Sequence, residues 1–170
     1  MSSSQPSGLV LAVHPTSRGF GWVLFEGPMA PDLWAIATRK KDDYSAWCMK
    51  HFGKLLEEYR PRALVLESRN MSDESKVGRA GLLAQSMRGF AANHDIDVYV
   101  YSRAEVGAAL VSNASAKRDD VVKAVAKLLP VLSDRVPSER KNWESLDDRR
   151  CLFDAAALGL THYSVTRPTA

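Results

Sequence analysis

Short apolar runs alternate with longer amphipathic stretches along the chain. Residues 9–13 form a nearly continuous apolar run, partly β-branched and stopped by His14 and Pro15, which is typical of a buried central strand. Apolar and aromatic residues within 19–25 and 33–38 predict two further strands, and Gly27-Pro28 closes the first of these. Three short strands joined by turns predict an antiparallel meander.

The rest of the chain alternates between helix and strand patterns. Helical spacing predicts a helix that is capped by Asp42 or Asp43 and ends before Pro61. Leu82, Leu83, Met87 and Phe90 should form the buried side of a later helix, and Ser115 should open another. We expect the remaining elements in this order: strand 63–66, helix 73–93, strand 98–101, a short helix opened by a Ser102–Glu105 capping box, helix 115–129, loop 131–142 and helix 146–162. This order predicts an α/β fold with a mixed five-stranded sheet, a meander followed by βαβ crossovers, and helices on both faces.

Composition narrows the class of protein without identifying it. The chain has 170 residues, 45% of them hydrophobic, and 23 Lys and Arg against 20 Asp and Glu give a net charge of +3. These values suit one globular domain over residues 9–170, preceded by a flexible tail over residues 1–8. No apolar run approaches the roughly 18 residues of a membrane span, and no secretory signal is visible, so we expect a cytoplasmic protein. The small positive charge permits a nucleic-acid partner without requiring one.

Three polar residues stand where the pattern calls for apolar or turn residues. His14 and Glu67 each end a predicted strand, and Asp154 lies in an almost wholly apolar helix. If the two strands are neighbours, His14 and Glu67 meet at one end of the sheet, where a crossing helix could bring Asp154. An imidazole with two carboxylates suits Mg²⁺ or Mn²⁺, and two such ions about 4 Å apart could hydrolyse a phosphodiester.

Each of these residues also has a simpler explanation. A histidine at a strand end is often only packed or solvated. Glu67 could pair with Arg69 across a turn, and Asp154 could pair with Arg149 or Arg150 one turn earlier.

The segments that carry these residues resemble a known family. Residues 10–21 are similar to the first hairpin of the RuvC-type Holliday junction resolvases, and residues 64–67 are similar to its second acidic strand. Residues 115–129 look like its later basic helix, and residues 153–162 like its final acidic helix. The resemblance implies an RNase H-like fold and a homodimeric endonuclease that cuts branched or structured DNA with Mg²⁺ or Mn²⁺. By the same resemblance Glu67 and Asp154 would be metal ligands and catalytic residues.

The sequence departs from the family pattern at two ligand positions. His14 stands where the family has its first Asp, and an imidazole cannot bridge two ions as a carboxylate does. Cys151 stands at a further acidic position, where Asp147, on the same helical stripe, could substitute as a metal ligand. Asp147 could equally favour only the start of the helix. Two functions therefore stay open: a metal-dependent endonuclease with His14 as a nonstandard ligand, or a weakened or inactive protein that still binds nucleic acid.

Basic residues near these segments are candidate phosphate contacts, although any one of them could belong to a solvated face. They are Arg18, Arg69, Lys76, Arg79, Arg88, Lys117 and Arg118. The family's aromatic wedge after the acidic strand is missing or altered, since Arg69, Asn70 and Met71 stand there. Small residues at 78, 80, 81 and 84 are explained by close packing on the sheet or, alternatively, by a homodimer seam.

Overall fold

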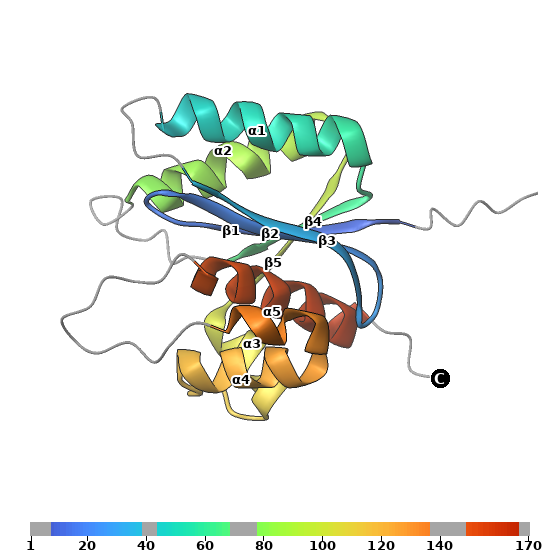
Figure 1. Ribbon diagram of the computed structural model, residues 1–170. Coiled ribbons are helices and arrows are strands. Elements are labelled where there is room, and N and C mark those ends of the chain that lie inside the picture. Colours follow the sequence, from blue (N-terminus) through green and yellow to red (C-terminus); the bar gives the residue numbers. More distant parts are fainter. Residues whose placement is uncertain (1–7, 39–43, 69–77, 137–148, 167–170) are drawn as a thin grey trace, which may run out of the picture.

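A five-stranded sheet lies between two layers of helices in the computed structural model (Figure 1). The structure describes residues 8–38, 44–68, 78–136 and 149–166. Its strands are β1 (Val10–Pro15), β2 (Gly19–Gly27), β3 (Ala30–Thr38), β4 (Ala63–Glu67) and β5 (Asp97–Tyr101). Its helices are α1 (Tyr44–Tyr59), α2 (Arg79–Asn93), α3 (Arg103–Val111), α4 (Arg118–Leu128), the 3₁₀ helix η2 (Pro130–Arg135) and α5 (Arg149–Thr166).

The strand order is β3-β2-β1-β4-β5. β1 pairs antiparallel with β2 and β2 antiparallel with β3, whereas β4 runs parallel to both β1 and β5. The predicted meander followed by parallel crossovers is thereby confirmed. It places β1 and β4, which carry His14 and Glu67, side by side.

Alternation along β1 divides the core into two halves. Val10 and Ala12 pack in a cluster with α3, α4 and α5, whereas Leu11 and Val13 pack in a cluster with α1 and α2. Successive strand residues point to opposite faces, so each face of the sheet receives its own apolar set. The predicted helices on both faces are confirmed, and Figure 1 shows α1 and α2 on one side with α3, α4 and α5 on the other.

Helix α5 comes unusually close to the sheet because glycine stands at the crossing. A Cβ atom on Gly21 of β2 would lie 2.5 Å from the backbone carbon of Cys151 and 2.6 Å from its oxygen. At Gly159, two turns further along α5, a Cβ would lie 2.1 Å from the ring of Phe25. Both glycines therefore let helix and sheet approach to a distance that a side chain would prevent.

Several element boundaries differ from the predicted ones. β1 continues through His14 and Pro15, which pair with Gly21 and Phe20, because a strand end tolerates proline's missing N–H. β3 begins at Ala30 rather than at residue 33. Residues 131–135, the first part of the predicted loop 131–142, belong to η2, in which Leu132 is fully buried.

Two predictions about the helices are wrong within the described residues. α4 begins at Arg118 rather than at Ser115, because the backbone N–H of Ser115 bonds to Oδ1 of Asn113 at 2.9 Å in a preceding turn. Leu82, predicted as buried, is 56% exposed, since Leu83 and Met87 define the buried side of α2 and Leu82 lies about 100° away. The predictions on residues 1–7, 73–77, 137–142 and 146–148 lie outside the described part of the chain.

Candidate functional site

Two polar residues lie at the carboxyl ends of the neighbouring parallel strands β1 and β4. The register of the two strands pairs Ala12 with Val65, and His14 and Glu67 each come two residues later. Because Ala12 and Val65 face the α5 side, the period of two directs His14 and Glu67 to the same side. His14 is only 4% exposed, so its imidazole belongs to the interior of the protein.

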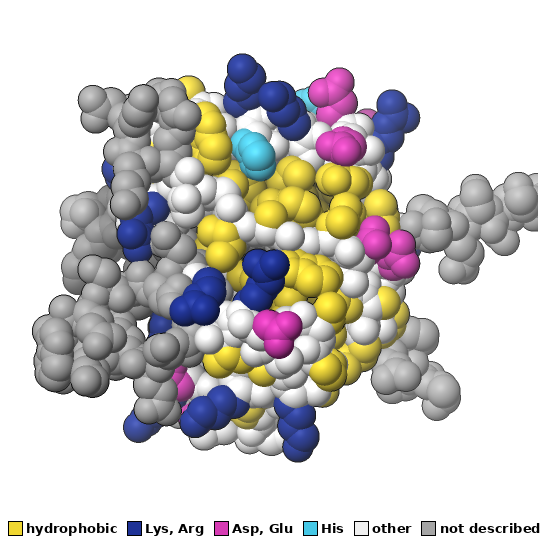
Figure 2. Space-filling model, in the orientation of Figure 1, with side chains coloured by type: hydrophobic (Ala, Val, Ile, Leu, Met, Phe, Trp, Pro, Cys, Tyr) yellow, Lys and Arg dark blue, Asp and Glu magenta, His cyan; other side chains and the backbone are white. Residues whose placement is uncertain are grey.

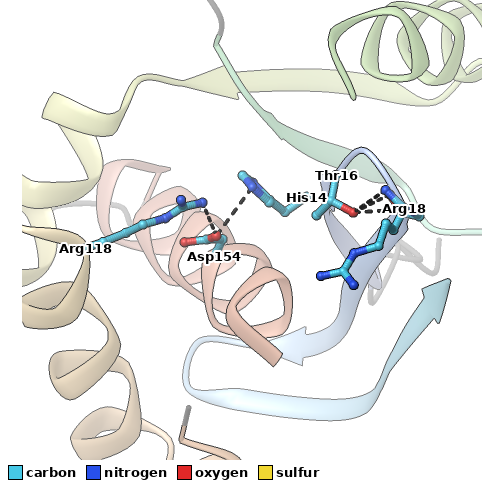
Figure 3. Close-up of polar contacts among 6 residues, drawn as sticks. His14, Thr16, Arg18, Arg118 and Asp154 are labelled. Carbon is cyan, nitrogen blue, oxygen red and sulfur yellow. Dashed lines mark hydrogen bonds and ion pairs between the residues drawn. The ribbon is translucent and has the colours of Figure 1, made fainter. Parts of the chain in front are cut away.

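Asp154 reaches this position from α5. Its Oδ2 lies 3.4 Å from Nε2 of His14, and its side chain is 14% exposed (Figure 3). The close crossing at Gly21 accounts for the contact, because Gly21 pairs with His14 and touches Cys151, one helical turn before Asp154. The predicted meeting of His14 and Asp154 is therefore present in the structure.

Arg118 of α4, which the sequence predicts as a phosphate contact, lies against Asp154. Its Nη2 donates a hydrogen bond to Oδ2 of Asp154 at 2.6 Å, the same oxygen that faces His14. Burial by itself lowers the pKa of Arg118, but the charge and hydrogen bond of Asp154, with a smaller contribution from Glu67, raise it overall. The guanidinium is therefore permanently charged. It lies close to the carboxylates of Asp154 and Glu67, rather than pointing only outward to where a phosphate of a nucleic acid could bind.

A second ion pair joins the same two helices, with the donor on α5 and the acceptor on α4. Arg150 of α5 donates through Nη2 to Oδ1 of Asp119 of α4 at 2.8 Å. The alternative in which Arg150 pairs with Asp154 is wrong, because the partner of Arg150 is on the adjoining helix. The two pairs together fix the position of α4 beside α5, and with it the position of Arg118.

A small cavity of about 30 Å³ opens between these elements. Glu67, Arg118 and Asp154 line it, together with Arg103, Ala116 and apolar side chains of α3, α4 and α5. This space has room for a water molecule but not for a nucleotide base. A polymeric ligand therefore has to approach the site from its rim.

The described residues do not fit a divalent metal ion as they are arranged. Among them no group of three or more His, Cys, Asp or Glu side chains is placed to hold an ion. The well-placed carboxylate oxygen of Asp154 is already bonded to a guanidinium, and Cys151, 3% exposed, packs in the core. Asp147, predicted as a further ligand, lies outside the described residues, and the roles of His14, Glu67 and Asp154 as ligands stay predictions.

The turn between β1 and β2 forms the other border of the site. Oγ1 of Thr16 accepts hydrogen bonds from the backbone N–H groups of Arg18 and Gly19, both at 3.1 Å. Tyr44 of α1 donates its hydroxyl to the carbonyl of Thr16, and the guanidinium of Arg79 lies 4.2 Å from the centre of the Tyr44 ring. The turn is thus tied to α1 and α2, and Figure 3 shows the His14–Asp154 contact between Arg18 and Arg118.

The predicted phosphate contacts have different surroundings. Lys117 and Arg88 are exposed, Arg79 stacks on Tyr44, and Arg69 and Lys76 lie outside the described residues. Figure 2 shows Lys and Arg side chains spread over both helical layers of the face in view rather than gathered in one patch. No helix in the described ranges is long and apolar enough to cross a membrane.

Comparison with known proteins identifies the architecture. No protein-family model and no curated protein matches the sequence. The structure matches Thermus thermophilus RuvC in complex with a Holliday junction substrate, with a TM-score of 0.70, 18% identity and coverage of 94% of this chain and 95% of RuvC. The chain has the RuvC-type, RNase H-like fold.

Two further solved structures share this RuvC-type fold. The yeast mitochondrial Holliday junction resolvase matches with a TM-score of 0.57 and 14% identity, over 96% of this chain and 83% of the resolvase. The fowlpox virus Holliday junction resolvase matches with a TM-score of 0.53 and 19% identity, over 92% of this chain and 98% of the resolvase. These similarities confirm the predicted fold class, and they confirm the resemblance of the sequence segments at the level of the fold.

Proposed function

We propose that this protein binds branched or structured DNA through its RuvC-type fold and does not use a divalent metal at His14, Glu67 and Asp154 to cleave it. The observation that carries the proposal is the 2.6 Å hydrogen bond from Arg118 to Asp154. It supports a site whose carboxylate is already neutralised by a residue of the chain itself. The DNA partner is supported by solved structures of this fold, since Thermus thermophilus RuvC and, in a further structure, the fowlpox virus resolvase are each in complex with a Holliday junction substrate.

Phosphate contact would come from the rim of the site. Arg18 lies in the β1–β2 turn on one side, and Lys117, the N-cap residue of α4, lies one residue before Arg118 on the other. Backbone N–H groups at the start of α4 add an attraction for anions beside Lys117. A DNA backbone that crosses the sheet end would meet both cations without entering the small cavity.

Fluorescence anisotropy with a labelled four-way junction and a matched duplex, both in EDTA, tests binding. We expect tighter binding to the junction, with affinity that falls steeply as salt rises. Lys117→Gln should reduce the slope of log affinity against log salt by about one unit, as expected for a lost phosphate contact. Lys127→Gln, the same charge change in the last turn of α4, should leave the slope unchanged. If wild-type protein binds neither DNA, or if both variants behave alike, this proposal is wrong.

A metal-dependent endonuclease is the second candidate. Glu67 and Asp154, the two carboxylates expected of such an enzyme, do line one cavity. Incubation of wild-type protein with labelled junctions in Mg²⁺ and in Mn²⁺ decides between the two functions. Cleavage that is lost in Glu67→Gln would establish the endonuclease, whereas binding without cleavage in either metal supports the first proposal.

A homodimer is an additional proposal, supported by α2. Close packing explains Gly81, which is buried, but leaves Leu82 56% exposed on the adjoining side of the helix. The small residues of α2 would let a second copy approach closely, and Leu82 would lie at such a symmetric contact. Light scattering of the purified protein measures the oligomeric state directly.

A further inference from the structure

The charges around the cavity balance without a metal ion. Glu67 and Asp154 contribute two negative charges, and Arg103 and Arg118 contribute two positive charges, with Arg118 within hydrogen-bond distance of Asp154. Burial makes such charges costly unless each has a partner nearby. A cation is therefore required at Asp154, and in this chain a side chain provides it.

One oxygen of the Asp154 carboxylate is already occupied. Oδ2 accepts from Nη2 of Arg118 at 2.6 Å and faces Nε2 of His14 at 3.4 Å. An ion bound to this oxygen at a coordination distance of about 2.1 to 2.3 Å would lie next to the guanidinium and be repelled by it. The positive charge of Arg118 therefore competes with a divalent ion for the Asp154 carboxylate.

Arg118 is held in this position by more than its own hydrogen bond. The next residue, Asp119, is bonded at 2.8 Å to Arg150 of α5, whose side chain is 8% exposed. Arg118 is also the first residue of α4, so its backbone moves only if the start of this helix moves. The cation is thus tethered to the helix that carries its carboxylate partner.

We propose that the guanidinium of Arg118 takes the place of a divalent cation at Asp154 and keeps metal ions out of this site. This inference deepens the proposed DNA-binding function and rests on it only in explaining why binding would occur without cleavage. It assigns Arg118 a role distinct from phosphate contact. It also predicts that a site for divalent ions is latent in the chain and appears when the positive charge is removed.

Titration with Mn²⁺ tests this inference, followed both by calorimetry and by the loss of the free-ion electron paramagnetic resonance signal. Mn²⁺ suits a donor set that includes an imidazole as well as carboxylates. We expect the neutral variants Arg118→Met and Arg118→Gln to bind Mn²⁺ at least tenfold more tightly than wild-type protein. Arg118→Gln keeps N–H donors toward Asp154, so it tests the charge even if Arg118→Met fails to fold, which circular dichroism would reveal.

Three further proteins serve as controls. Arg103→Met removes a positive charge from the lining of the same cavity and should not create Mn²⁺ binding. Arg118→Lys keeps the charge and should also stay without Mn²⁺. Arg118→Gln combined with Asp154→Asn should lose whatever binding Arg118→Gln gained.

Two results would overturn the inference. One is tight Mn²⁺ binding by wild-type protein that Asp154→Asn abolishes. The other is a folded Arg118→Gln protein that binds Mn²⁺ no better than Arg103→Met. The DNA-binding proposal fails separately, through absence of junction binding in EDTA, so the two failures are distinguishable.

Discussion

Replacing Gly21 by alanine should separate α5 from the sheet at the candidate site. The added Cβ would lie 2.5 Å from the backbone carbon of Cys151, and ordinary van der Waals contact begins at 3.4 Å. Both neighbours are backbone atoms of regular elements, so no flexible side chain can yield. Overpacking of this kind costs about 1 to 3 kcal/mol of folding free energy. For a urea m-value of about 2 kcal/mol/M, the unfolding midpoint would fall by about 0.5 to 1.5 M.

Urea unfolding followed by circular dichroism measures this effect, with Gly27→Ala as the matched control. Gly27 lies at the far end of the same strand, and a Cβ there would meet nothing within 4 Å. Its replacement should be neutral or slightly stabilising, by up to about 1 kcal/mol, because alanine restricts the unfolded chain. Equal unfolding midpoints for the two variants would refute the close-crossing argument, and with it the explanation of how Asp154 reaches His14.

Three other predictions concern buried groups and the surface of α2. Burial raises the pKa of Cys48 to about 11, and Cys151 is 3% exposed. Neither thiol should therefore react with Ellman's reagent at pH 8 until urea unfolds the protein. Fast labelling of the native protein would contradict this prediction. Burial lowers the pKa of His162 below 6.5, so protonation opposes folding and the free energy of unfolding should fall as pH drops from 7 to 5. His162→Gln should flatten that decrease, and parallel pH profiles for variant and wild type would show the reasoning to be wrong. Leu82→Glu should shift any dimer toward monomer in light scattering, and an unchanged mass for a wild-type dimer would exclude this face as the seam.

The sheet and three of the site residues follow from local pattern. Residues 9–13 and 63–66 are apolar enough to predict buried strands, and a polar residue that ends each run marks the same end of a parallel pair. Asp154 was conspicuous because its neighbours on the helix are apolar. These signals are local, so they can be interpreted without knowing how the helices and strands pack.

The partner of Asp154 could not be predicted in the same way. Arg118 is 36 positions earlier in the chain, and its reach depends on where α4 begins and how it is rotated against α5. The Ser115 signal gave a start three residues too early, because the Asn113 turn competes for that backbone. Leu82 shows the same limit, because nothing in two adjacent leucines indicates which of them faces the sheet.

The paired contacts between α4 and α5 restrict how the two helices can move. Residues 118 and 119 of α4 form ion pairs with residues 154 and 150 of α5, so each helix contributes one donor and one acceptor. A slide of one helix along the other would stretch at least one of these pairs, and a rotation would break both. Any movement of α4 along α5 that frees the Asp154 carboxylate therefore also strains the Arg150–Asp119 pair, so the charge at this end of the sheet is coupled to the position of α4.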